Sequence, residues 1–516
     1  MLAAAVLPMS TVGHSGVSAA GPSLQPSPQY AVRVDGEPAF VYLATTDGAN
    51  VHNSSFVHIT LHPGTSREVL VTVLQPMDPA HPSPGRRAAA LRPEPARAGS
   101  ALPVVRPRSV DGSTWSFTIS QPLHAVLEFD TVYQLESLSS GLMVFVEFVD
   151  ANPPDKADPT VRFFGAGVHE LPLVPGWGVD KGSRGLELQS HQTLYLAEGA
   201  VLLGGIRAYN VQNITIKGFG IIAATFLPGA AVGGARESCQ YCLCGGDHGI
   251  EIVNSSKVIL DGVSVMHATN WDIRLQGLTD VHVSRVKVMA WRCWNDGIDV
   301  VSSRDVVIEN VFIRSDDDSI AVKGMDPAMN TQNLVVRNSV FWNQRYGNCM
   351  EIGFELFNAQ VRNITFEHNV CLHQSGSIMS IHNGGQSRVH DVQYRNIIAQ
   401  TLASDQARGC DGNGCLMMFD MRVVYGQYCR VGPPPHGDGC SDPSLRGSIA
   451  DVLMEDIQVH GNGLQLRYSA LAGNSTAHGL DRISIRNFTI DGVRVQSLQD
   501  LNTSVGPFVT RVTVGG

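Results

Sequence analysis

The sequence of 516 residues is poor in charged side chains, which make up 16% of it against 43% hydrophobic residues. This balance excludes an intrinsically disordered chain, because such chains combine high charge with low hydrophobicity. The formal net charge is −10, and lysine and arginine form no continuous stripe. The composition therefore predicts a folded protein with no nucleic-acid partner, and it disfavours a strongly anionic partner.

Long hydrophobic runs are also missing. No apolar run approaches the roughly 18 residues that a membrane span needs, so no span is expected. Residues 1–29 begin with a short apolar patch but lack a basic leading region, and we expect a disordered or residual signal segment there. Helical periodicity is absent as well, whereas glycine is abundant, at 52 residues, which fits a chain with many turns.

The ten cysteines are mostly clustered in two irregular segments. The members of these clusters are Cys239, Cys242, Cys244, Cys410, Cys415, Cys429 and Cys440. Such clusters predict disulfides in an oxidising compartment, although the spacing of Cys239 and Cys242 also suits a zinc site. Seven glycosylation acceptor triplets point the same way, to a secreted glycoprotein, at Asn53, Asn213, Asn254, Asn363, Asn474, Asn487 and Asn502.

One pattern returns nine times from about residue 210 onward: a polar residue, alternating apolar residues, a polar or glycine corner, and alternating apolar residues again. Examples are "NITIKGFGII" at Asn213 and "DVVIENVFIR" at Asp305. Alternation predicts strands with one buried face, and two short strands in a repeat of twenty-odd residues predict a parallel β-helix. The corners suit a positive φ and stacked polar ladders: Gly218, Gly262, Arg285, Asn310, Asn338, His368, Asn396, Asp456 and Asn487.

The N-terminal part shows alternating strands without this repeat. We therefore expect three regions: residues 1–29 as above, a small N-terminal β-sandwich over 30–155, and a β-helix catalytic domain over 156–516. Insertions at about 227–247 and 403–446 break the repeat and are expected to leave the helix as loops.

Two repeats carry carboxylates that the others lack, in "NDGID" and "SDDDS". Asp296 precedes Asp317 and Asp318 by 21 and 22 residues, close to one coil, so stacking would bring the three together. Burying isolated carboxylates is costly, so each strand must bend before its first inward isoleucine and leave the acids outside. Asp316 is expected to be a plain turn residue. A polar aspartate ladder without chemistry is the alternative.

A cluster of three carboxylates suits hydrolysis of a glycosidic bond. One acid must stay protonated to donate to the leaving oxygen, while others must be ionised to activate water. Crowding separates the pKa values, because the cluster cannot easily hold every negative charge. No cofactor and no metal are required by this chemistry.

At these residues the chain resembles the polygalacturonase clan of right-handed parallel β-helix hydrolases, glycoside hydrolase families 28 and 49. The resemblance rests on "NDGID", on the acidic triplet and on their spacing. It implies an inverting glycosidase with Asp317 as general acid, while Asp296 and Asp318 share the base role and hold the water. The partner is then a polysaccharide or oligosaccharide.

The departures from family 28 concern the substrate. Its Gly-His-Gly stretch is replaced by a segment containing Asn348, and its Arg-x-Lys pair for a sugar carboxylate matches "GSIMSIHNGG" over 376–385, without lysine or arginine. The "DDDS" and "EIGFEL" stretches and the N-terminal sandwich resemble the dextranase group of family 49. A neutral polysaccharide is therefore favoured over pectin.

Seven residues near the acids are candidates for substrate binding: Trp294, Asn295, Lys323, Asn348, Glu351, His382 and Asn383. Trp291, Trp342 and Tyr346 are further aromatic candidates for stacking on sugars, but aromatic residues also pack between coils. For Lys323 a surface charge, and for His382 a structural hydrogen bond, are the alternatives. Two other functions stay open: a Ca²⁺-dependent polysaccharide lyase, and a non-catalytic β-helix that binds carbohydrate. A secreted monomer is expected.

Overall fold

The computed structural model describes residues 26–44, 54–74, 89–93, 105–129, 141–175, 183–224, 248–266, 268–290, 294–343, 347–374, 376–400, 417–424, 446–461 and 469–515. Regular structure in these residues is almost entirely β; the exception is a single 3-10 turn, η4 (Gln499–Leu501). Within the same residues no helix has the length and apolarity needed to span a membrane.

The N-terminal part is a β-sandwich of two five-stranded sheets. One sheet has the order β2 (Glu37–Ala39), β1 (Tyr30–Val34), β5 (Arg67–Val73), β8 (Thr114–Ile119) and β7 (Arg108–Ser109). The other has the order β3 (Val41–Ala44), β4 (Ser54–Leu61), β10 (Leu142–Phe148), β9 (Leu123–Phe129) and β6 (Ala89–Arg92). Residues 26–29, which the sequence analysis assigned to the leading segment, join this unit: the Ser27 amide donates to the Val41 carbonyl at 2.9 Å.

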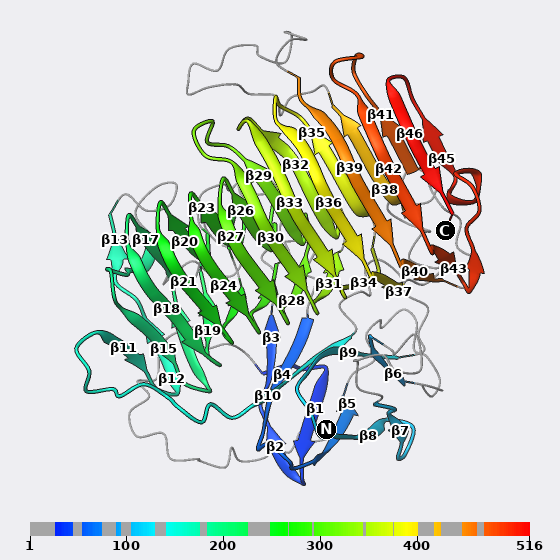
Figure 1. Cartoon of the computed structure of the whole chain (residues 1–516). Helices are drawn as coiled ribbons and strands as arrows, with labels where there is room; N and C mark the ends of the chain where they lie inside the picture. Colours follow the sequence, from blue (N-terminus) through cyan, green and yellow to red (C-terminus); the bar gives the residue numbers. More distant parts are fainter. Residues whose placement is uncertain are drawn as a thin grey trace, which may run out of the picture.

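The rest is a right-handed parallel β-helix of three 12-stranded sheets, and most coils give one strand to each sheet (Figure 1). At each end of the helix, two strands of one sheet pair antiparallel within a single coil. Sheet 1 contains β11 (Val161–Phe164), β15 (Thr193–Leu196), β18 (Gln212–Gly218), β21 (Ser256–Asp261), β24 (Thr279–Ser284), β27 (Arg304–Glu309), β30 (Thr331–Arg337), β33 (Gln360–Glu367), β36 (Arg388–Arg395), β39 (Ser448–Glu455), β42 (Leu480–Arg486) and β46 (Val509–Val514).

Sheet 2 contains β12 (Gly167–Glu170), β16 (Ala200–Leu203), β19 (Ile221–Ala223), β22 (Ser264–Met266), β25 (Lys287–Met289), β28 (Phe312–Ser315), β31 (Val340–Asn343), β34 (Val370–Leu372), β37 (Ile398–Gln400), β40 (Gln458–His460), β43 (Thr489–Ile490) and β44 (Val493–Arg494). Sheet 3 contains β13 (Leu173–Val174), β14 (Ser183–Glu187), β17 (Gly205–Tyr209), β20 (Ile250–Val253), β23 (Ile273–Gln276), β26 (Ile298–Val301), β29 (Ile320–Gly324), β32 (Met350–Leu356), β35 (Ser377–Asn383), β38 (Met417–Val423), β41 (Ser469–Ala472) and β45 (Thr503–Val505).

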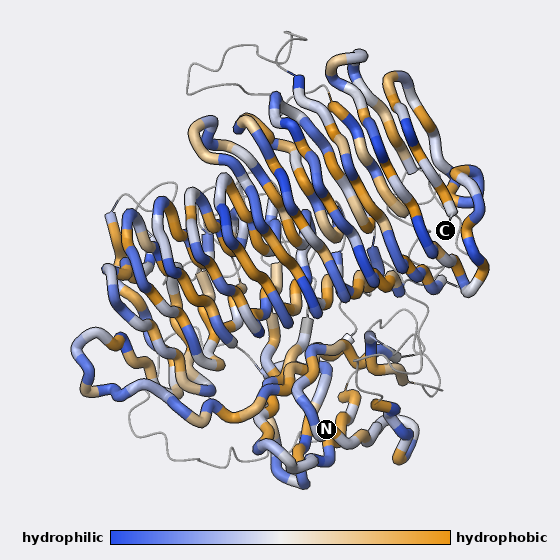
Figure 2. Tube along the Cα trace, viewed as in Figure 1, coloured by the Kyte–Doolittle hydropathy of each residue, from blue (hydrophilic) through white to orange (hydrophobic). Residues whose placement is uncertain are grey.

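Hydrophobic and hydrophilic residues alternate along the strands of the helix (Figure 2). In sheet 1 every second residue is buried, as in Val258 and Leu260. Equivalent aliphatic side chains stack from coil to coil and form one continuous core, as Ile250, Ile273, Ile298 and Ile320 do along sheet 3. No single coil could bury its own inner face, so the stability of each coil depends on its neighbours.

All nine corner residues named from the sequence have a positive φ, from 45° at Asn487 to 114° at Gly218. The expectation of a bend between the first two strands of each repeat is therefore confirmed. A second left-handed position recurs at the start of each repeat, for instance at Asn333 and Asn363. One step of the polar ladder expected at the corners joins Asn487 to Asp456, whose Oδ1 accepts from the Asn487 side-chain amide. The Asn363 side-chain amide donates to Asn333 Oδ1 at 2.9 Å, so the starting positions form a ladder as well.

The sandwich packs against the outer face of sheet 2, beside β28 and β31 (Figure 1). Phe56 and Phe145 of the sandwich share a buried cluster with Phe312 and Trp342 of the helix. Strand β10 is buried on both faces for this reason, because it lies between the sandwich core and the helix. The idea that Trp342 stacks on sugar is wrong: its ring is fully buried and lies 3.8 Å from the Arg314 guanidinium.

Candidate active site

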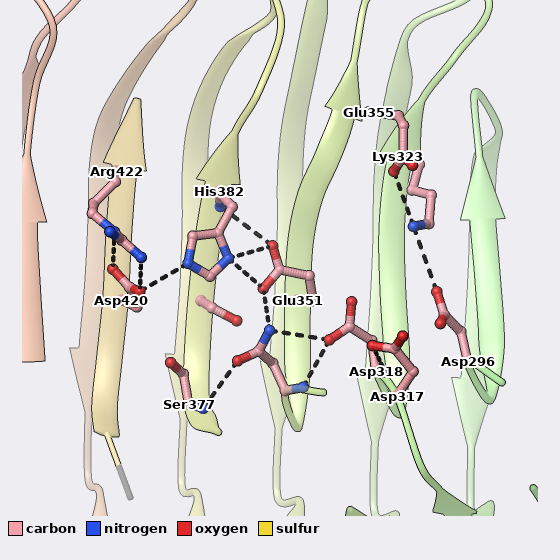
Figure 3. A network of polar contacts seen from close by, with 12 residues as sticks. Asp296, Asp317, Asp318, Lys323, Glu351, Glu355, Ser377, His382, Asp420 and Arg422 are labelled. Atoms are coloured by element: carbon pink, nitrogen blue, oxygen red, sulfur yellow. Dashed lines mark hydrogen bonds and ion pairs between the residues drawn. The ribbon is translucent and has the colours of Figure 1, made fainter. Parts of the chain in front are cut away.

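The three aspartates lie where the chain enters sheet 3. Asp296 precedes β26, and Asp317 and Asp318 precede β29. These strands pair in parallel with Ile298 opposite Ile320, so the two turns are stacked, and the Gly297 amide donates to the Asp318 carbonyl at 2.8 Å. The structure thus brings the acids together from adjacent coils, on one side of the sheet (Figure 3).

The acids lie outside the apolar core but are less exposed than the sequence suggested. Ile298 and Ile320 point into the core, whereas Asp296 lies 3.5 Å from Lys323 Nζ on the outer side. The exposed fractions of Asp296 and Asp318 are only 3% and 4%, while Asp317 is half-buried. Asp316 is buried too, at 2%, so the expectation of an ordinary turn residue is wrong.

Lys323 is the cation at the centre of this cluster. Its ammonium lies 3.0 Å from Glu355, 3.5 Å from Asp296 and 3.7 Å from Asp299, and 4.6 Å from the centre of the Trp271 ring. Burial alone would lower the pKa of Lys323, but Glu355, Asp296 and Asp299 raise it well above its ordinary value. The lysine therefore stays charged and is no free surface cation.

Burial is the main cause that shifts the carboxyl groups toward protonation. It raises the pKa of Asp296 well above the ordinary value, and the charge of Asp299 raises it further. It also raises the pKa of Asp318 well above the ordinary value, and there the charge of Asp317 raises it further. Burial likewise raises the pKa of Asp317, and that of Asp299 to about 7, although Lys323 opposes both shifts. Several acids here share one cation, so part of the cluster holds protons at neutral pH.

Asn348 lies beside Asp318. Its backbone amide and its Nδ2 donate to Asp318 Oδ1 at 2.7 and 3.0 Å. The same Nδ2 donates to Glu351 Oε2 at 3.1 Å, and the Ser377 amide donates to Asn348 Oδ1 at 2.9 Å. Asn348 therefore links the acids of one coil to the polar side chains of the next two.

A second ionic group continues across the next strands. His382 Nδ1 lies 3.0 Å from each Glu351 oxygen, and its Nε2 lies 2.9 Å from Asp420 Oδ2. Burial lowers the pKa of His382, but Glu351 and Asp420 outweigh burial and raise it to about 10. Arg422 holds the far side of Asp420 at 2.5 Å. The stretch 376–385, which lacks lysine and arginine, therefore contributes one cation, His382, and its acidic neighbours neutralise that charge.

The seven candidates for substrate binding fall into two groups. Lys323, Asn348, Glu351 and His382 form the network just described, and Trp294, 44% exposed, lies two residues before Asp296. Asn295 and Asn383 instead hold the backbone: Asn295 Nδ2 donates to the Asn270 carbonyl at 2.5 Å, and Asn383 Nδ2 donates to the Ser387 carbonyl at 2.7 Å. Their exposed fractions are 1% and 0%, so we correct the assignment of these two to substrate binding.

The sequence analysis gave no role to Asp299, Asp420 or Trp271. Asp299 stands in the "NDGID" stretch, directly after Ile298, which points into the core. Because side chains alternate along a strand, this position already indicated a carboxylate on the outer face. Trp271 follows the insertion at about 227–247, which obscures the repeat register. Asp420 lies within the segment 403–446 that was expected to leave the helix as a loop; this expectation is wrong at β38, which pairs with β35 in sheet 3. The contact of Trp271 and Asp420 with the site becomes visible only in the folded coils.

Several expectations fall outside the described residues: Trp291, Tyr346, the insertion at about 227–247, most of that at 403–446, and both cysteine clusters with their disulfide or zinc alternatives. The structure does contain a disulfide that the sequence analysis did not predict, between Cys349 and Cys371. Among the described residues no group of three or more His, Cys, Asp or Glu is arranged to hold a metal ion.

The fold is a parallel β-helix, as the resemblance implied. Residues 188–406 match the model of the family "Glycosyl hydrolases family 28", which confirms the resemblance to the polygalacturonase clan. The structure is similar to that of Dex49A from Penicillium minioluteum, with a TM-score of 0.63 and 12% identity over 97% of this chain and 96% of that one.

It is also similar to a polygalacturonase from Erwinia carotovora ssp. carotovora, with a TM-score of 0.47 and 17% identity over 64% of this chain and 85% of that one. No curated protein sequence matches the chain. The family match supports a glycoside hydrolase, and the likeness to Dex49A supports the fold, sandwich included.

Proposed function

We propose that this chain is an inverting glycoside hydrolase that cleaves O-glycosidic bonds in a polysaccharide. The observation that carries the proposal is the cluster of Asp296, Asp317 and Asp318 from adjacent coils around a single lysine. A site that must hold one protonated and one ionised carboxyl group needs such crowding, because crowding spreads the pKa values of the group.

Exposure favours Asp317 as the general acid. Lys323 beside Asp296 and the two donors of Asn348 beside Asp318 lower the pKa of these two carboxyl groups, but burial outweighs them and keeps both pKa values well above the ordinary value. Asp317 accepts the Asp318 amide at 3.0 Å and is the most exposed of the three. It is therefore the carboxyl group best able to reach the leaving oxygen of a sugar, with Trp294 beside it as a stacking surface.

The charges around the acids favour a neutral polysaccharide such as an α-glucan over a polyuronate. Among the described residues next to the three aspartates, Asp299 and Glu355 add two more acids, against one cation, Lys323. On the neighbouring strands His382 and Arg422 are cations, but Glu351 and Asp420 neutralise them. No net positive charge of these groups is left to hold a chain of sugar carboxylates.

The test is hydrolysis of dextran, pullulan and polygalacturonate, with the anomer of the first product followed by NMR. The Asp317→Asn variant should lose at least about 100-fold of the activity on the best substrate, the usual scale of general acid catalysis. Asp280→Asn changes an exposed aspartate on the neighbouring coil and should keep full activity. Retention of the anomeric configuration would contradict the proposed mechanism.

Two other functions give different results in the same assay. A Ca²⁺-dependent lyase would make unsaturated products and stop when a chelator is added. A non-catalytic carbohydrate-binding β-helix would retain binding, and show no turnover, in both the wild type and Asp317→Asn.

We further propose a secreted, glycosylated monomer. The Cys349–Cys371 disulfide supports an oxidising compartment, because such bonds persist mainly outside the cytosol. Recovery of the protein from the medium of an expressing cell, its mobility before and after removal of N-glycans, and its mass by light scattering test these three points.

A further inference from the structure

We infer that Glu351 and His382 are positioning residues: acting through Asn348, they fix the orientation and the electrostatic surroundings of Asp318 and do not themselves contact the substrate. The inference rests on the proposed function, and it replaces the assignment of both residues to substrate binding. It starts from burial, since the exposed fractions of Glu351 and His382 are 0% and 4%.

The contacts form one chain across four neighbouring strands. Asp420 on β38 contacts His382 on β35, which contacts Glu351 on β32, and Glu351 accepts a hydrogen bond from Asn348 at the start of that strand. Asn348 in turn donates to Asp318, just before β29. Figure 3 shows the labelled side chains of this row lying on the same side of sheet 3.

The direction of the Asn348 amide is fixed by its partners. The Ser377 backbone amide can only donate, so the atom of Asn348 that lies 2.9 Å from it must be the oxygen Oδ1. The NH₂ group then faces both Asp318 Oδ1 and Glu351 Oε2, with one hydrogen for each. Both donors of Asn348 reach Oδ1 of Asp318 and neither reaches Oδ2, the oxygen that we assign to the attacking water.

Glu351 and His382 act on Asp318 with opposite charges. The Glu351 carboxylate disfavours the anion of Asp318, as do Asp317 and Asp296, while Lys323 favours it. His382 faces Glu351 from one side and Asp420, backed by Arg422, from the other, and its ring stacks on Phe354 at 4.5 Å. Tyr394, whose hydroxyl donates to the Ser380 carbonyl, is the remaining titratable group near Glu351.

Removing the charge of Glu351 and removing the charge of His382 should therefore shift the pKa of Asp318 in opposite directions. With Glu351→Gln the acidic limb of the pH profile of kcat/KM should move to lower pH, because a negative neighbour of Asp318 is lost. With His382→Gln it should move to higher pH, because Glu351 is then no longer neutralised. Each displacement should be about one pH unit, the scale for a neighbouring charge.

A merely structural role would not produce opposite displacements. As a control, Arg395→Gln removes an exposed ion pair with Glu455 on sheet 1 and should leave the profile in place. Displacement of both profiles in the same direction, or of neither, in folded variants with unchanged melting temperatures would overturn the inference.

A second measurement does not depend on hydrolysis. In protein labelled in its histidines, the NMR signal that is missing from His382→Gln identifies His382. In the wild type it should stay protonated up to pH 8, and Asp318→Asn should lower its pKa measurably by removing a linked negative charge. Titration of His382 near pH 6.5, or no response to Asp318→Asn, would refute the inference even if no substrate is found. Absence of any hydrolysis together with the expected NMR response would instead refute only the proposed function.

Discussion

Two buried lysines on different faces of the same β-helix both lower the pKa of their acidic neighbours, but with different outcomes. Lys287, between sheet 2 and the sandwich, is fully buried, with its ammonium 2.7 Å from Glu147 on β10. Lys323, on sheet 3, has three carboxylates within 4 Å. Burial raises the pKa of Glu147, but Lys287 and His124 outweigh burial and lower it, whereas the pKa values of Asp296 and Asp299 stay raised.

The difference lies in the number of acids for each cation. Glu147 has Lys287 for itself and also His124 at 2.6 Å, so it remains ionised and ties the sandwich to the helix. Around Lys323 the acids outnumber the cation, so some of them must take up protons. The first arrangement suits a fixed structural contact, and the second suits a site that exchanges protons.

The largest effect on stability is expected from breaking the first pair. Lys287→Met would leave Glu147 buried without its ammonium partner, which should lower the free energy of unfolding by about 3–5 kcal/mol. Urea unfolding at pH 7 measures this. Lys156→Met, on an exposed turn, should change it by less than about 0.5 kcal/mol. A loss as small as that of the control would show that the pair is dispensable.

Breaking the second cluster should change activity more than stability. In Lys323→Met the acids around the missing ammonium can respond by binding protons, so their pKa values should rise further. The acidic limb of the kcat/KM profile should move to higher pH by roughly 1–3 units. If Lys323→Met instead melts as early as Lys287→Met with an unmoved profile, the two lysines have the same role.

The pH dependence of stability sharpens the comparison through a change of slope. The pKa of Asp299 is raised from 3.8 to about 7, so the folded state binds this proton more tightly and the wild type loses stability as the pH rises through that window. Asp299→Asn should remove a slope of at most about 1.4 kcal/mol per pH unit there.

Glu147 gives the opposite sign. Its pKa is lowered from 4.5, so its contribution is present at higher pH and is lost as the pH falls below that value. Glu147→Gln should therefore flatten the acid side of the stability curve. Urea unfolding at several pH values between 3 and 8 measures both variants, and equal slopes in the two would contradict the comparison.

The part of the fold that depends on local chemistry was predictable from the sequence. The alternation of apolar and polar residues predicted the strands. Residues that tolerate a positive φ, such as Gly218 and Asn310, predicted the corners. The left-handed positions at the start of the repeats were not predicted. Lys257 and Arg482 occupy two of them, and neither residue type favours that conformation. Coil stacking imposes it there.

Contacts between distant parts of the chain were not predictable. The acids could be aligned because their two coils differ by one simple repeat, from Ile298 to Ile320. The disulfide joins Cys349 and Cys371, 22 residues apart, where the turn before sheet 3 obscures which positions face each other. Likewise, nothing around Trp342 distinguishes a sugar platform from a residue buried under a second domain.

The attachment of the sandwich has a mechanical consequence. A stack of coils joined only through neighbours can rotate slightly about its long axis, one coil relative to the next. The sandwich packs against sheet 2 from Val201 to Leu372. This part of sheet 2 includes the coils that carry Asp296 and Asp318. The contact therefore restricts twisting of the coils that set the distance between acid and base, and leaves twisting possible in the coils beyond β37.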